Sequence, residues 1–179
     1  MNKIVGILAI FLALLTIDGV ARTPAADFFE ELETLCGSRF VGEMTFPLEG
    51  QDSFKDKILV AEIAECAEKQ LKIPFSVGDD KSRTWIVSSV DGGLRLKHKH
   101  LLKDGTVDPV SNYGGDTLEP GTILSQSFPA DDYTKTLIPE AASNVWTLSL
   151  SEDLTTLTYH LERHGKARFT AVLTIDTQR

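Results

Sequence analysis

The segment Leu94-Arg95-Leu96-Lys97-His98-Lys99-His100 alternates between apolar or imidazole side chains and basic side chains. Successive side chains of an extended chain point to opposite faces, so the leucines and histidines share one face and the basic residues share the other. This alternation predicts a strand in an antiparallel sheet with one buried face and one solvated face. We therefore expect His98 and His100 to point toward the interior.

Strand-like runs of the same period fill the chain after residue 37, with turn residues between them. Asp91-Gly92-Gly93, Asp104-Gly105 and Gly165-Lys166 offer the positive-φ residues that tight antiparallel hairpins need, so neighbouring runs are expected to pair. The expected strands are Arg39–Phe46, Lys57–Cys66, Gln70–Val77, Arg83–Val90, Gly93–Leu102, Val107–Tyr113, Thr122–Phe128, Asn144–Leu150, Thr155–Arg163 and Ala167–Asp176.

A helix is expected before the first strand. Thr23 is suited to cap it, Pro24 to occupy its first position, and Gly37 to end it. Its apolar residues Phe28, Leu32 and Leu35 recur at helical spacing, which predicts a stripe that packs on a larger body. The links Pro47–Asp56 and Pro129–Ser143 are long enough for a lid or a short helix, and a brief helix is expected to start near Asp131.

The fold class that this pattern predicts is all-β. Eight to ten antiparallel strands in meander order, with the short N-terminal helix, are expected to curl into a β-barrel, because closure removes the free edges of the sheet. A barrel of that size can hold a ligand in its lumen. Alternation alone does not specify closure, so a β-sandwich with the same strand order is the alternative.

Composition and charge limit the classes of partner. The chain has 179 residues, with 26 acidic and 18 basic side chains and a formal charge of −8. It lacks the basic surface that neutralises a phosphate backbone, so we expect no nucleic-acid partner.

The first residues have the pattern of a signal peptide. Lys3 precedes an apolar run from Ile4 to Ile17, and small residues up to Ala21 follow it. The run of about fourteen residues is shorter than the roughly 20 that cross a bilayer as a helix. We expect residues 1–21 to be a cleaved signal peptide and residues 22–179 to be a single domain that is secreted or periplasmic, without a stable membrane span.

Export makes a disulfide between Cys36 and Cys66 the expected state of the two cysteines. The alternative is a pair of buried free thiols that pack as small apolar residues. Neither cysteine has a histidine near it in the sequence, so nothing in the pattern indicates a catalytic thiol.

Three interpretations of His98 and His100 are open. They are polar anchors inside a ligand cavity, ordinary hydrogen-bonded structural residues, or half of a metal or haem-iron site. Two histidines two residues apart on a strand lie about 6.5–7 Å apart at their Cα atoms and can converge on one ion. A third ligand would have to come from another strand, where Glu162 or His160 could serve.

Signatures of enzymes are mostly missing from the sequence. It has no G-x-S-x-G elbow, phosphate-binding glycine loop, H-E-x-x-H or C-x-x-C motif, so no catalytic residue is predicted and the cofactor is unknown. Trp85 and Trp146 each combine a large apolar surface with one N–H donor, which suits a core plug or a cavity wall. Tyr113, beside the Gly114-Gly115 pair, is expected at a rim, where a flexible bulge is the simplest interpretation.

The helix, the following Cys36-Gly37-Ser38-Arg39-Phe40-Val41-Gly42 and the β-meander with its aromatic residues resemble the calycin superfamily of lipocalin-like barrels. The resemblance implies that a small apolar or amphipathic molecule binds in the lumen. The expected ligand contacts are of three kinds. The wall consists of Leu96, Trp85, Tyr159 and Phe169, the polar anchors are His98 and His100, and the residue at the rim is Tyr113.

The chain also resembles a group of exported bacterial proteins of unassigned function. This second resemblance covers about a fifth of the chain, from Arg83-Thr84-Trp85 through Leu94–His98 to Tyr113–Thr117. It implies no activity. Two alternatives to a ligand carrier are therefore open. One is a metal- or haem-binding protein that uses His98 and His100 and that could also be an enzyme. The other is a structural envelope protein or interaction module without a cavity.

Overall fold

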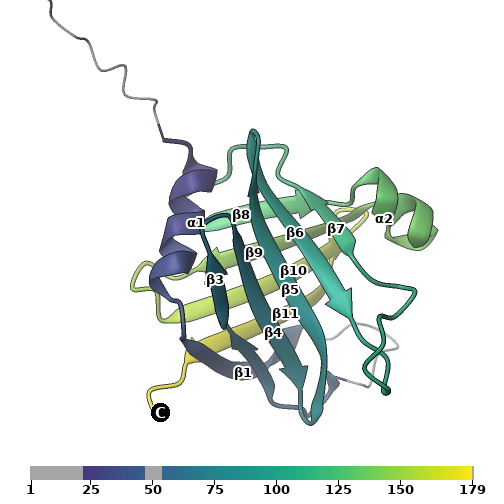
Figure 1. The fold of residues 1–179 in the computed structure, drawn as a ribbon, viewed down its shortest axis with the longest axis horizontal. Coiled ribbons are helices and arrows are strands. Elements are labelled where there is room, and N and C mark those ends of the chain that lie inside the picture. Colours follow the sequence, from purple (N-terminus) through teal and green to yellow (C-terminus); the bar gives the residue numbers. More distant parts are fainter. Residues whose placement is uncertain (1–21, 47–53, 179) are drawn as a thin grey trace, which may run out of the picture.

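The computed structural model describes residues 22–46 and 54–178 (Figure 1). The expected signal peptide, residues 1–21, and residues 47–53 of the expected Pro47–Asp56 link lie outside these described residues. The strands are β1 (Arg39–Phe46), β2 (Leu59–Glu62), β3 (Glu65–Ala67), β4 (Gln70–Val77), β5 (Asp80–Val90), β6 (Gly93–His100), β7 (Tyr113–Asp116), β8 (Ser125–Pro129), β9 (Asn144–Leu150), β10 (Thr156–Arg163) and β11 (Lys166–Ile175). The helices are α1 (Pro24–Thr34), α2 (Asp132–Leu137) and the 3-10 helix η2 (Pro139–Ala141).

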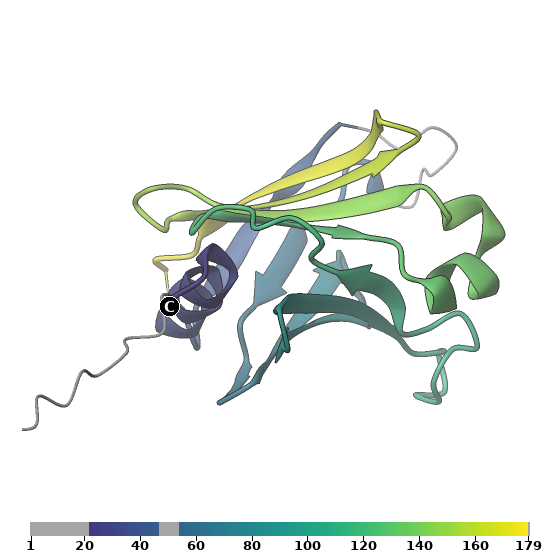
Figure 2. The same cartoon turned by 90° about the horizontal axis from the view of Figure 1, so that it is seen from above.

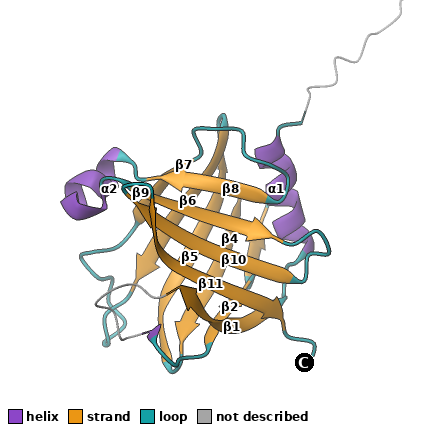
Figure 3. Ribbon diagram, turned by 180° about the vertical axis from the view of Figure 1, so that it is seen from behind, coloured by secondary structure: helices purple, strands orange, loops and turns teal. Residues whose placement is uncertain are grey.

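The strands form one antiparallel sheet that curls into a nearly closed barrel (Figures 2 and 3). Their order is β7-β6-β5-β4-β2-β1-β11-β10-β9-β8, and β3 pairs with β4 off this path. The strands follow one another as a meander except where β1 pairs with β11, which joins the first strand of the chain to the last. The expected all-β barrel with a short N-terminal helix is confirmed.

The edge strands β7 and β8 meet at a seam that side chains complete. Gly114 and Gly115 are buried there, and a Cβ atom on Gly115 would lie 1.7 Å from the Pro129 carbonyl oxygen, so only glycine allows this approach. The Thr134 hydroxyl accepts a hydrogen bond from the Gly114 N–H at 2.7 Å and donates one to the Gly114 carbonyl at 2.8 Å. The interpretation of the Gly-Gly pair as a flexible bulge is therefore wrong, because both glycines belong to β7.

Two expected strands differ from those observed. The run Val107–Tyr113 is irregular up to Asn112, with a bridge between Val107 and Leu101, because Pro109 has no N–H and the Asp108 carboxylate accepts the Val110 N–H. Its last residue, Tyr113, begins β7. The run Lys57–Cys66 is divided into β2 and β3. The division falls at Ile63, whose N–H and carbonyl bond to the chain just after α1 rather than to a neighbouring strand.

One half of the barrel, which we call the closed half, is filled by α1 and leucine-rich inner faces. The Thr23 hydroxyl caps α1 by accepting the Ala26 N–H, and Pro24 occupies its first turn, as expected. The fully buried side chains of this half include Phe28, Leu32, Phe40, Leu94, Leu96, Leu148, Leu157 and Leu173.

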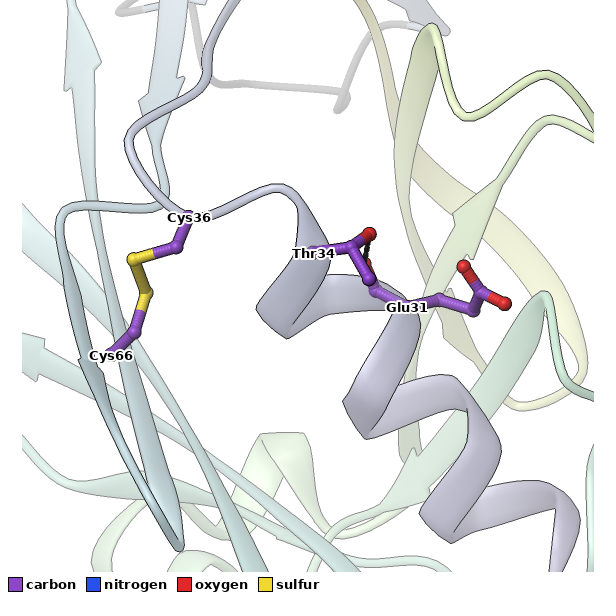
Figure 4. Close-up of a disulfide and its surroundings, with 4 residues drawn as sticks. All are labelled: Glu31, Thr34, Cys36 and Cys66. Atoms are coloured by element: carbon purple, nitrogen blue, oxygen red, sulfur yellow. Dashed lines mark hydrogen bonds between the residues drawn. A yellow bond between two sulfur atoms is a disulfide. The ribbon is translucent and has the colours of Figure 1, made fainter.

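The chain after α1 is tied to β3. Cys36 and Cys66 lie at disulfide distance, with their Cα atoms 6.3 Å apart, and the bond links the end of α1 to the sheet (Figure 4). The expected pairing of the two cysteines is present in the structure. Among the described residues, no helix is both long and apolar enough to cross a membrane.

Candidate functional site

The other half of the barrel, which we call the open half, contains an open cavity of about 860 Å³. Its lining comes from the ends of the strands that lie away from α1, together with η2 and the segment before β7 (Figure 1). The aromatic residues of the lining are Phe54, Phe75, Trp85, Tyr113, Trp146, Tyr159 and Phe169. The same strands thus build a packed interior in one half and an accessible one in the other.

A stack of aromatic rings forms one wall of the cavity. Trp85 stacks on Phe75 and on Tyr159, with ring centroids 4.4 and 4.5 Å apart, and the Trp85 and Tyr159 planes are inclined by only 12°. The Phe75 and Tyr159 centroids are themselves 6.5 Å apart, so the three rings form a compact cluster. Phe169 meets the Tyr159 ring edge to face at 5.9 Å. Flat, closely packed rings of this kind offer a rigid apolar surface to a ligand.

His98 is buried beneath these rings with both ring nitrogens in use. Its Nδ1 lies 3.2 Å from the Tyr113 carbonyl oxygen, so Nδ1 carries the proton and donates it. Its Nε2 then accepts a hydrogen bond from the Tyr159 hydroxyl at 2.9 Å. Burial lowers the pKa of His98 to about 3 and raises that of Tyr159 well above its usual value, so both groups are neutral at physiological pH.

His100 lies nearer to solvent and pairs with a second phenol. Its Nε2 lies 2.9 Å from the Tyr113 hydroxyl. Burial, and after it the positive charge of Arg83, lowers the pKa of His100, while burial raises that of Tyr113 to about 12. The two histidines thus hold two tyrosines in fixed orientations at the cavity wall.

Charged side chains gather in the remainder of the lining, which includes Arg83, Arg163, Arg168, Asp108 and Glu140. Arg83 forms an ion pair with Asp80 at 2.6 Å and lies over the Phe54 ring at 5.4 Å from its centroid. Arg163 donates its Nε–H to the Asn144 side-chain carbonyl at 2.8 Å. The cavity lining is therefore amphipathic, with both aromatic rings and guanidinium groups.

The structure brings most of the expected contact residues together. Trp85, His98, His100, Tyr113, Tyr159 and Phe169 line the cavity. Leu96 does not line the cavity. It lies two residues before His98 on the same face of β6 and is fully buried in the closed half. The sequence pattern gives the face on which a residue lies but not how far along the barrel the packed half extends.

Several lining residues were not expected. Arg163 shares the inner face of β10 with Tyr159 and Leu161, so the alternation of that strand could have indicated it. Arg168 could not have been found in this way, because a register shift between β10 and β11 breaks the alternation beside it.

The third metal ligand considered for the histidines is misplaced. Glu162 and His160 occupy the alternate, outer positions of β10. The His160 Nε2 lies 3.6 Å from the Glu162 Oε1, and neither side chain points toward His98. Between residues 22–46 and 54–178, no group of three or more histidine, cysteine, aspartate or glutamate side chains is arranged to hold a metal ion. In the described structure, the candidate third ligands Glu162 and His160 therefore do not complete a site with His98 and His100.

Comparison with known proteins adds no further assignment: no family model, no curated protein and no solved structure matches this chain. The functional interpretation therefore depends on the geometry of the cavity itself.

Proposed function

We propose that the protein binds a small apolar or amphipathic molecule in the cavity of the open half. The observation that carries this proposal is the aromatic wall of Phe75, Trp85 and Tyr159 beside a cavity of about 860 Å³. Sites for small molecules are typically about 300–1,000 Å³ in volume and combine apolar walls with a few fixed polar groups. The tyrosine hydroxyls held by His98 and His100 are such groups.

We further propose that this binding takes place outside the cytoplasm, in a secreted or periplasmic protein of the lipocalin-like kind. The disulfide-distance pair Cys36–Cys66 supports an oxidising compartment, and the sequence pattern of residues 1–21 supports export. A carrier of apolar molecules has an evident use in such a compartment, where these molecules are poorly soluble.

The test is a titration with N-phenyl-1-naphthylamine, a fluorescent probe that is uncharged at neutral pH. Both tryptophans of the chain line the cavity, so a probe bound there quenches tryptophan emission and gains emission by energy transfer. We expect saturable binding at one site with a Kd on the order of micromolar.

A matched pair of variants on β10 locates the site, with probe emission excited directly as the readout. Leu161→Trp places an indole in the cavity and is expected to weaken binding by at least roughly tenfold. Thr158→Trp places the same ring at an outer position of the same strand and is expected to leave the Kd unchanged. No saturable binding, or equal affinity in both variants, would contradict the proposal. Stoichiometric metal or a haem band that is lost in His98→Ala would favour the metal- or haem-binding alternative instead.

A further inference from the structure

Two arginines converge on the cavity from the β10–β11 hairpin. Arg163 ends β10 on its inner face. The pairing of β10 with β11 contains a bulge at Arg168. The consecutive residues Leu161 and Glu162 of β10 pair with Phe169 and Ala167 of β11, so Arg168 between them has no partner in the ladder. Because such a bulge redirects a side chain, Arg168 lines the cavity together with its neighbour Phe169, which a regular strand would not allow.

The guanidinium of Arg168 is incompletely satisfied. Its Nε is buried and has no hydrogen-bond partner in the part of the chain that the structure describes. A buried donor without an acceptor is costly, and more so when it belongs to a charged group. An acceptor that enters the cavity at this point would remove that cost.

Within residues 22–46 and 54–178, the charges of these two arginines also lack a direct counter-ion. Arg22, Arg39, Arg83 and Arg95 each form an ion pair with a carboxylate. Among the described residues, Arg163 and Arg168 are the arginines that do not. Asp108 and Glu140 line the same cavity but form no ion pair with them; the Asp108 carboxylate accepts the Val110 N–H, and Glu140 is exposed on η2.

From these observations we propose that Arg163 and Arg168 form a subsite for the anionic head group of the ligand, a carboxylate or a phosphate monoester. This inference rests on the proposed function, since it assigns the polar end of a ligand whose apolar part lies on the aromatic wall. The planar fork of a guanidinium binds both kinds of oxyanion through two parallel hydrogen bonds. The ligand class is therefore an anionic amphiphile rather than a neutral one.

The experiment is displacement of N-phenyl-1-naphthylamine by four compounds of equal chain length, each below its critical micelle concentration. They are decanoate, decyl phosphate, decanol and decylammonium. We expect at least one of the two anions to bind about tenfold or more tightly than decanol, which corresponds to about 1.4 kcal/mol, and decylammonium to bind most weakly. The ranking of decanoate against decyl phosphate distinguishes the two head groups.

Variants of the two arginines then locate the preference. Arg168→Gln and Arg163→Gln are each expected to reduce the ratio of anion affinity to decanol affinity by about tenfold. Arg95→Gln, which removes an arginine from the outer Arg95–Asp116 pair, is the matched control and is expected to preserve the ratio. Arg168→Lys retains the charge without the fork and serves where the glutamine variant does not fold.

The outcomes separate the two proposals. Equal affinity for decanol and both anions in the wild-type protein, or an unchanged ratio in the arginine variants, would overturn the anion subsite while leaving the cavity as a binding site. Failure of the uncharged probe to bind would overturn the proposed function and, with it, the subsite.

Discussion

The closed and open halves of the barrel use the same strands in opposite ways. On β10, Leu157 is fully buried in the closed half, whereas Leu161, four residues later on the same face, lines the cavity. On β6, Leu94 and Leu96 give way to His98 and His100. The comparison indicates that the half covered by α1 is packed and stabilises the barrel, whereas the other half contains an open cavity.

The largest expected difference between the halves is in the response to loss of a leucine side chain. Leu157→Ala leaves a void in a packed interior and is expected to lower the free energy of unfolding by about 3–5 kcal/mol. Leu161→Ala is expected to cost roughly half as much or less, because the side chain already lacks packing partners toward the cavity. Urea denaturation of the two variants measures both values, and equal losses would remove the distinction between the halves.

The buried imidazole makes the open half sensitive to acid. The pKa of His98 is about 3 in the folded protein against 6.5 for a free histidine, so the unfolded chain binds the proton first as the pH falls. Stability is therefore expected to decrease as the pH falls from 6.5 toward 3, by up to about 1.4 kcal/mol per pH unit for this group. The pKa of His100 is also lowered, so His100 adds to the loss of stability as the pH falls.

The dependence of stability on pH is measured from denaturant midpoints between pH 6.5 and about 4.5. This range lies above the pH at which most carboxylates titrate. His98→Gln is expected to flatten this dependence, whatever its effect on stability at neutral pH. His164→Gln replaces an exposed histidine and is the control that keeps the slope. An unchanged slope in His98→Gln would mean that this histidine is not held neutral by burial.

The seam between β7 and β8 is expected to depend on one hydroxyl. Thr134→Val removes both hydrogen bonds to Gly114. The Gly114 carbonyl keeps the hydrogen bond from the Asp131 N–H at 2.9 Å, but the buried Gly114 N–H loses its acceptor, so a loss of about 1–3 kcal/mol is expected. Thr136→Val on the same short helix removes an exposed hydroxyl and is expected to change stability by less than about 0.5 kcal/mol. Faster amide hydrogen exchange in β7 of Thr134→Val would place the effect at the seam; equal stability of the two variants would contradict it.

The smallest expected effect concerns Arg83, which lies over the Phe54 ring and pairs with Asp80 at the edge of the cavity. Both contacts are partly exposed, so Arg83→Ala is expected to lower the thermal midpoint by only a few degrees, in line with about 1 kcal/mol. Lys81→Ala, an exposed position on the same strand, is expected to leave the midpoint unchanged. A loss above about 3 kcal/mol would mean that Arg83 holds the open half together.

Much of the barrel could be predicted from alternation, because a side-chain period of two is a direct consequence of strand geometry. The inner face of β10, with Leu157, Tyr159 and Leu161, follows from the sequence in this way. The irregular run before β7 could not be predicted so simply, since local turn chemistry at Asp108 and Pro109 outweighs its apolar residues.

The site was predictable only in part for a similar physical reason. The pattern placed His98 and Leu96 on one face, but the end of the packed half depends on how far α1 and the inner leucines fill the lumen. Arg168 depends on a bulge, which is a property of the pairing of two strands rather than of either sequence alone.

The most direct test of the division between the halves is a crystal structure of the protein soaked with N-phenyl-1-naphthylamine. The naphthyl ring is expected against Trp85 and Tyr159 in the cavity, with the closed half unchanged. Density for the probe only on the outer surface, such as beside Arg39 and Lys81, would contradict the assignment of the open half as the binding half.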